Sequence, residues 1–86
     1  MKKNELDNLK MMIDNIVNSK TKKDGKILYD KLSSNISYFE DTLSYYCFTK
    51  LKYVIGMAKD ASGRVRNKAH RKMYTEQLWY KFYTCI

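Results

Sequence analysis

Apolar side chains recur every three or four residues along the middle of this chain. They are Phe39, Leu43, Tyr46, Cys47, Leu51, Val54, Met57 and Ala58. Because an α-helix turns once in about 3.6 residues, this spacing predicts a helix over residues 38–60 with one apolar stripe. Phe48, Tyr53 and Ile55 add apolar groups beside the stripe. We therefore expect several neighbours to bury this helix at the centre of the fold.

Shorter segments of the chain repeat the helical period. The clearest stripe consists of Leu6, Leu9, Ile13, Ile16 and Val17. We expect further helices over residues 4–19, 26–34 and 64–84, the last bent or broken near residue 75. The 86 residues contain no proline, which permits long helices. A chain of this length makes one small domain, so the expected fold is an all-α, compact bundle of about four helices.

Capping and turn residues mark the expected helix ends. Asn4 is placed to N-cap the first helix, and residues 19–25, which end in Asp-Gly, indicate a loop. Ser37 precedes Glu40 by three residues, the spacing of a capping box. Gly63 follows the central helix, where glycine favours a left-handed C-terminal cap.

The positive charge lies almost entirely in the second half of the chain. Residues 1–49 hold eight Lys against seven Asp and Glu, a net of +1. Residues 50–86 hold nine Lys and Arg against two acids, a net of +7. The domain thus has a near-neutral part, 1–49, and a strongly basic and aromatic part, 50–86. Clustered cations attract polyanions, so this asymmetry predicts an anionic partner.

The candidate binding residues gather in one basic run and the aromatic segment that follows it. If the run is helical, Arg64, Lys68, Arg71 and Lys72 share one face. Arginine binds phosphate in a bidentate manner, and exposed aromatic rings stack on unpaired bases. A solvated helix face is the alternative for the same cations. The candidates are Arg64, Arg66, Asn67, Lys68, His70, Arg71, Lys72, Trp79 and Tyr80.

A second, weaker basic segment consists of Lys20, Lys22, Lys23 and Lys26. It would extend the positive surface only if the fold brought it beside residues 64–72. We expect a solvated turn instead.

Aromatic side chains surround the expected helix of residues 74–86 on nearly every side. We expect them to pack in the core, with a homodimer interface as the alternative. Tyrosine and phenylalanine are also dense in residues 44–54 and 78–84. Because aromatic residues favour strands, an added β element is an alternative in both stretches.

Two cysteines, Cys47 and Cys85, lie 38 positions apart. Small domains that rely on disulfides usually carry more cysteines, so we expect free thiols and a cytoplasmic protein. The N-terminal segment, residues 1–7, turns acidic where a signal peptide has an apolar stretch. No apolar run is long enough to cross a membrane, so no transmembrane segment is expected.

No residue pattern in the sequence indicates catalysis, a metal or a cofactor. His70 is flanked by cations, and no glycine-rich phosphate loop is present. We expect a non-enzymatic protein that binds nucleic acid or a nucleic-acid-handling complex. A phage or mobile-element regulator or inhibitor, acting like an anti-CRISPR protein, would fit. The alternatives are a membrane-surface, immunity-type bundle that binds a membrane protein, and a structural oligomerisation module.

Overall fold

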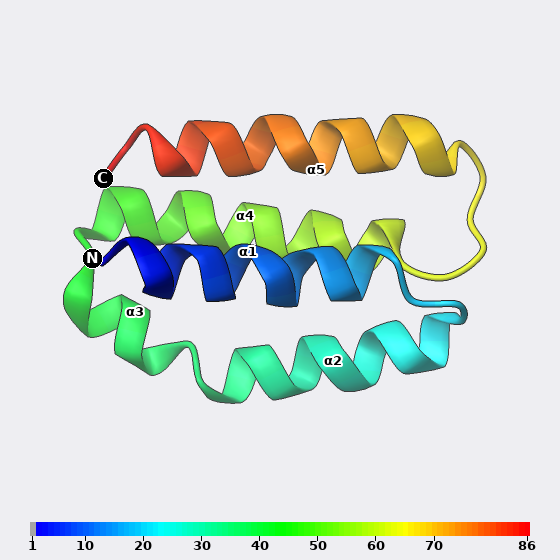
Figure 1. Cartoon of the computed structure of the whole chain (residues 1–86), viewed down its shortest axis with the longest axis horizontal. Helices are drawn as coiled ribbons and strands as arrows, with labels where there is room; N and C mark the ends of the chain where they lie inside the picture. Colours follow the sequence, from blue (N-terminus) through cyan, green and yellow to red (C-terminus); the bar gives the residue numbers. More distant parts are fainter. Residues whose placement is uncertain (1) are drawn as a thin grey trace.

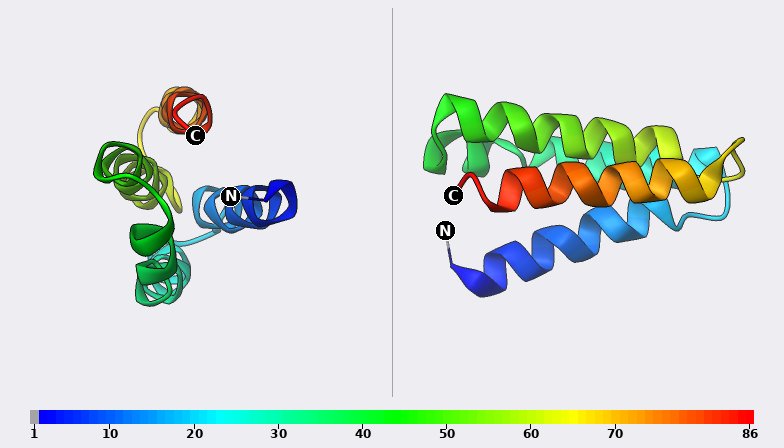
Figure 2. Two further views of the ribbon diagram at one scale, coloured as in Figure 1. Left: turned by 90° about the vertical axis from the view of Figure 1, so that its left-hand side faces the viewer. Right: turned by 90° about the horizontal axis from the view of Figure 1, so that it is seen from above.

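The computed structural model describes residues 2–86 and contains five α-helices joined by short loops (Figure 1). The helices are α1 (Lys3–Val17), α2 (Lys22–Ser34), α3 (Ser37–Thr42), α4 (Tyr45–Ala61) and α5 (Lys68–Tyr83). The end-on view in Figure 2 shows the four longer helices standing around one centre. Residues 2–86 contain no β-strand. The expected all-α bundle is therefore confirmed, and the β alternative is wrong.

Helix α4 packs against each of the other four helices, but it stands around the common core with them and does not lie at the centre of the fold as expected. Phe48 and Ile55 are buried as expected, but Tyr53 points to solvent with 66% of its surface exposed. Fully burying a Leu, Ile or Phe side chain contributes about 1.5–3 kcal/mol. Three helices supply the fully buried apolar residues, which include Leu9, Ile13, Ile16, Leu51, Val54, Ala58 and Phe82.

The segment expected as one helix over residues 38–60 forms two helices. The backbone is extended at Leu43, with φ −101° and ψ 155°, and again at Ser44. The Ser44 hydroxyl accepts a hydrogen bond from the backbone N–H of Cys47 at 3.3 Å. Serine is a preferred N-cap, so this bond starts α4 and ends the continuous helix that the apolar spacing predicted.

Two predicted helix caps are wrong. The N-cap of α3 is Ile36, which makes no side-chain capping bond, so Ser37 and Glu40 do not form a capping box. The N-cap of α1 is Lys2 rather than Asn4. Most helix stability in proteins comes from the packing of an apolar face, so a helix can start without a side-chain cap.

Helix α2 begins four residues before its expected start at residue 26. The Thr21 hydroxyl accepts from the backbone N–H of Asp24 at 3.1 Å and caps the helix. Gly25 is buried in the first turns of α2, where an added Cβ would lie 2.5 Å from the Cβ of Ser62. Asp24-Gly25 is therefore not a turn: the glycine lets α2 approach the chain that leaves α4.

Helix α5 starts four residues after its expected start and runs to Tyr83 without a break. The buried hydroxyl of Thr75 donates to the carbonyl oxygen of Arg71 at 2.8 Å, one turn earlier in the same helix. This local bond satisfies the hydroxyl inside the bundle. The predicted bend near residue 75 is absent.

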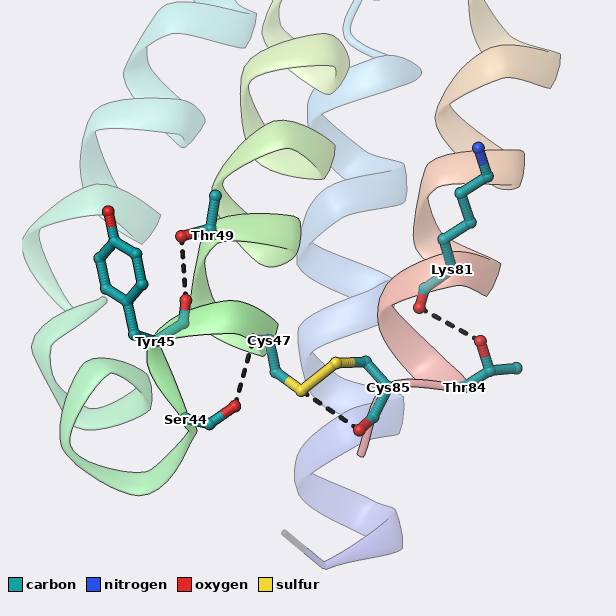
Figure 3. Close-up of a disulfide and its surroundings, with 7 residues drawn as sticks. All are labelled: Ser44, Tyr45, Cys47, Thr49, Lys81, Thr84 and Cys85. Carbon is teal, nitrogen blue, oxygen red and sulfur yellow. Dashed lines mark hydrogen bonds between the residues drawn. A yellow bond between two sulfur atoms is a disulfide. The ribbon is translucent and has the colours of Figure 1, made fainter.

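A disulfide joins Cys47 to Cys85 (Figure 3). Cys47 lies in the first turn of α4 and Cys85 follows α5, and their Cα atoms are 5.8 Å apart. The two helices are antiparallel neighbours, so their pairing brings both cysteines to the same end of the bundle. The prediction of two free thiols is therefore wrong. The separation of the two cysteines in the sequence does not show how α4 and α5 align.

Candidate nucleic-acid interface

The two loops at one end of the bundle touch each other. The backbone N–H of Gly63, after α4, donates to the carbonyl oxygen of Ser19, after α1, at 3.1 Å. Figure 1 shows both loops at the end opposite the two chain ends. Gly63 has φ +69°, and an added Cβ would lie 2.5 Å from the backbone nitrogen of Lys22. The positive φ expected at Gly63 is confirmed, but Gly63 does not cap α4: the C-cap is Ser62, and the Gly63 N–H donates to Ser19 instead. The glycine allows the close approach of the loops.

Two lysines bind the backbone carbonyls at this end. The Lys22 ammonium donates to the carbonyl oxygens of Lys59 at 3.1 Å and Asp60 at 2.8 Å. The Lys68 ammonium donates to the carbonyl oxygens of Val17, Ala61 and Gly63, the last at 2.9 Å. Because α1 ends at Val17 and α4 at Ala61, Lys68 neutralises the negative ends of both helices.

Lys68 therefore points inward and does not belong to an exposed basic face, contrary to the prediction. Burial lowers the pKa of Lys68, and the nearby charges of Lys72 and Lys22 lower it further. The sequence could not show this orientation, because lysine is nearly always exposed and the acceptors come from two other segments.

The first part of the predicted basic helix is a loop. Arg64, Arg66 and Asn67 are exposed and precede α5, and Asn67 takes a left-handed conformation with φ 56°. The Arg71 Nε donates to the carbonyl oxygen of Arg66 at 3.1 Å, which holds the loop against the helix. The predicted helical face of Arg64, Lys68, Arg71 and Lys72 does not form. The loop arginines and Lys72 remain available to a partner.

The fold brings the second basic segment beside this loop, so the expectation of an isolated solvated turn is wrong. The contact between Gly63 and Ser19 joins the two segments, and Lys22 is close enough to Lys68 to lower its pKa. We call the resulting surface the basic end. Its exposed cations include Lys22, which binds the carbonyls of α4, and five whose charged groups make no hydrogen bond, with His70 beside them. The five are Lys20, Lys23, Arg64, Arg66 and Lys72.

The cations of the basic end have no carboxylate within 4.0 Å. Within residues 2–86, the ion pairs involve only Lys10, with Asp14 and Glu76, and Lys26, with Asp30. Two exposed acids, Asp24 and Asp60, lie in or near the same segments. The surface therefore keeps an excess of positive charge that suits a phosphate-rich ligand.

The aromatic candidates lie further along α5. Trp79 is half-buried and packs against Phe82 and Tyr83, with ring centroids 5.4 and 6.4 Å apart. Lys10 of α1 approaches its ring at 6.0 Å, so Trp79 belongs to the contact between α1 and α5. Tyr80 is 68% exposed, but a helix rise of about 1.5 Å per residue puts it about 18 Å from Lys68. The structure does not bring these aromatics onto the basic end.

Three exposed tyrosines of α4 were missed as candidates. Tyr45, Tyr46 and Tyr53 are 86, 67 and 66% exposed. We expected Tyr46 within the apolar stripe and Tyr53 beside it, and both expectations are wrong because the two side chains are exposed. At about 100° per residue, the three positions point away from Leu51 and Ala58. Because aromatic residues are dense in this segment, we expected the tyrosines to be buried and did not consider them as binding residues.

The arrangement places exposed cations where an anion can bind. Within residues 2–86, no cluster of three His, Cys, Asp or Glu side chains could hold a metal ion. His70 is exposed at the edge of the basic end, where it can donate a hydrogen bond to phosphate. No family model, curated protein or solved structure matches this chain.

Proposed function

We propose that this protein is a non-enzymatic binding protein whose basic end engages the phosphate backbone of a nucleic acid, free or held in a nucleoprotein complex. The observation that carries the proposal is the contact that joins two loops into one surface. Within the described residues, five exposed cations of this surface make neither an ion pair nor a hydrogen bond through their charged groups. Counterion release makes such a surface bind nucleic acid most strongly at low salt.

Two further features of the basic end support phosphate as the ligand. The N-termini of α2 and α5 both lie there (Figure 1), and helix N-termini favour anions. No side chain caps α5. Arg64 and Arg66 stand on a loop, from which guanidinium groups can follow an uneven backbone.

An anionic membrane is the competing polyanion. Proteins that lie on membranes bury an apolar face next to their basic residues. The loop residues 18–23 and 62–67 contain one apolar side chain, Val65. Within residues 2–86, no helix has both the length and the apolar character needed to cross a bilayer. The scarcity of apolar side chains in the two loops themselves favours nucleic acid over lipid as their ligand.

A basic, compact protein of this kind would act by occupying nucleic acid or the surface that holds it. We propose the role of a regulator or inhibitor of a phage or mobile-element nucleoprotein complex, similar in action to an anti-CRISPR protein. Such a role would place the protein in the cytoplasm. Disulfides are rare in strongly reducing compartments, however, and this protein has the Cys47–Cys85 disulfide. Measuring the redox state of the two cysteines in cells tests the location.

The test compares two double variants that change net charge equally. Arg64→Glu with Arg66→Glu reverses the basic end, and Lys2→Glu with Lys3→Glu reverses two exposed lysines at the opposite end of the bundle. Each variant lowers the net charge from +8 to +4, because each substitution removes two units. The probes are fluorescein-labelled DNA and RNA, and vesicles containing anionic lipid.

We expect the arginine variant to lose at least tenfold in affinity for nucleic acid, and the lysine variant to keep wild-type affinity. Circular dichroism of each variant checks that it folds. Equal losses in the two variants would show that only net charge matters and would contradict a defined basic end. Flotation of the protein with vesicles, without nucleic-acid binding, would replace the proposal with the membrane alternative.

A further inference from the structure

A hollow of about 580 Å³ lies between the outer faces of α4 and α5. Lys52, Tyr53, Gly56 and Met57 line it from α4, and Tyr74 and Leu78 line it from α5. Tyr53 and Tyr74 are 66 and 43% exposed. The hollow thus presents one aromatic ring from each helix to solvent.

Gly56 lines the hollow from α4. An added Cβ at Gly56 would meet no heavy atom within 4 Å, so this position faces open space and a longer side chain can enter the hollow. A glycine in a helix interior costs about 1 kcal/mol relative to alanine.

A second cleft, of about 280 Å³, involves the same two helices near the disulfide. Tyr46 and Lys50 line it from α4, and Lys81 lines it from α5. The Lys50 ammonium lies 4.7 Å from the centre of the Tyr46 ring. Tyr46, Lys50 and Tyr53 share one face of α4 by their helical spacing. Both clefts lie where α4 and α5 meet, and we call the pair of them the α4–α5 groove.

The charge of the groove indicates which ligand can bind there. The two clefts are lined by four lysines and by a single carboxylate, that of Asp60. A second copy of this chain would place like charges against each other. A polyanion with flat apolar groups matches both the lysines and the exposed tyrosine rings.

The position of the groove connects it to the basic end. Asp60 lines the hollow and is followed by Ala61, the last residue of α4, so the groove begins where the basic loop begins. From Tyr46 to Asp60 the helix rises about 21 Å. That length suits the short end of the range of about 4–16 nucleotides that single-strand binding domains cover.

We propose that the α4–α5 groove binds single-stranded nucleic acid, with unpaired bases stacked on Tyr53 and Tyr74 and phosphates continuing onto the basic end. This inference rests on the proposed function and adds the strandedness of the ligand. Paired bases are stacked inside a duplex and cannot reach the rings, so a duplex contacts only the basic end.

The experiment measures fluorescence anisotropy of a labelled oligothymidine of about 12 nucleotides and of a duplex of the same length. The test variant is Tyr53→Leu with Tyr74→Leu, and Tyr53→Phe with Tyr74→Phe retains the rings. Tyr45→Leu is the matched control, because Tyr45 is 86% exposed on α4 and does not line the hollow. Gly56→Gln fills the hollow without changing the charge.

We expect the leucine variant and Gly56→Gln to lose about tenfold in affinity for the single strand, as loss of base stacking does. Their duplex binding stays unchanged, and the phenylalanine variant and Tyr45→Leu bind the single strand like wild type. Equal wild-type affinity for single strand and duplex, or unchanged single-strand binding by the leucine variant, would overturn the inference alone. Failure of the wild type to bind either probe at low salt would overturn the proposed function as well.

Discussion

The backbone N–H of Gly63 donates a hydrogen bond to the carbonyl oxygen of Ser19 at 3.1 Å. This bond joins two loops that are 44 residues apart in the sequence and places their cations on one surface. The left-handed conformation of Gly63, with φ +69°, leaves no room for a side chain beside Lys22. The basic end therefore depends on a backbone contact, and its cations are not held by carboxylates.

Lys68→Met should destabilise the protein by about 2 kcal/mol, because it leaves the carbonyls of Val17, Ala61 and Gly63 without their charged donor. The melting temperature should fall by about 8–16 °C. Lys72→Met is the control, since Lys72 is exposed and makes no such bonds. It should change stability by less than about 0.5 kcal/mol. Similar melting temperatures for the two variants would show that Lys68 is not a structural cation.

The two glycines inside helices should respond oppositely to alanine. Gly56→Ala should stabilise the protein by about 1 kcal/mol, since the added methyl meets nothing and the helix propensity improves. Gly25→Ala should destabilise it, because the new Cβ would lie 2.5 Å from the Cβ of Ser62. Adding Ser62→Gly removes that clash and should restore part of the loss. Chemical denaturation measures all three, and stabilisation by Gly25→Ala would contradict the packing of α2 on this loop.

The Cys47–Cys85 disulfide should leave no thiol that reacts with a thiol reagent in the unreduced, unfolded protein. For cysteines 38 positions apart, the chain-entropy relation gives a stabilisation of about 4 kcal/mol. Reduction should therefore lower the free energy of unfolding by about that amount. Cys47→Ala with Cys85→Ala should match the reduced protein and show no response to reductant. Two reactive thiols before reduction would contradict the bridge.

Lys10 should titrate above the ordinary lysine pKa of 10.5. Burial acts to lower the pKa of Lys10, but its hydrogen bonds to Asp14 and Glu76, each at 2.8 Å, outweigh burial and raise it. Because the folded pKa exceeds the unfolded one, this stabilisation is complete below pH 10.5 and is lost as pH rises through the folded pKa. Glu76→Gln should lower the pKa in a carbon-detected NMR titration. Glu40→Gln, at an exposed position, should leave the pKa of Lys10 unchanged. Equal Lys10 titration curves for the two variants would contradict the ion pair between Lys10 and Glu76 of α5.

The repetition of apolar residues was sufficient to predict the four longer helices and the buried stripes of two of them. The stripe from Leu6 to Val17 forms α1, and the stripe around Leu51 and Val54 forms the buried side of α4. Burial of an apolar stripe depends on local spacing, which a sequence displays directly.

The helix ends and the candidate site were harder to predict, because they depend on contacts between distant segments. Gly25 looked like a turn residue, but Ser62 explains why only glycine fits there. Lys68 looked like a surface cation, but its acceptors are carbonyls of other segments. The disulfide depends on how α4 and α5 are paired, which a separation of 38 residues does not reveal. The positive charge of the second half was visible in the sequence, but its union with Lys20 and Lys23 required the fold.

The salt dependence of nucleic-acid binding tests the central claim most directly. The observed binding constants of wild type and of the two charge-reversed double variants are measured between about 50 and 200 mM salt. If the five cations of the basic end whose charged groups make no hydrogen bond all contact phosphates, the logarithmic slope for wild type is about −4. Arg64→Glu with Arg66→Glu should reduce its magnitude by about 2, and Lys2→Glu with Lys3→Glu should leave it unchanged. A flat wild-type slope, or a wild-type slope in the arginine variant, would contradict the assignment of the basic end.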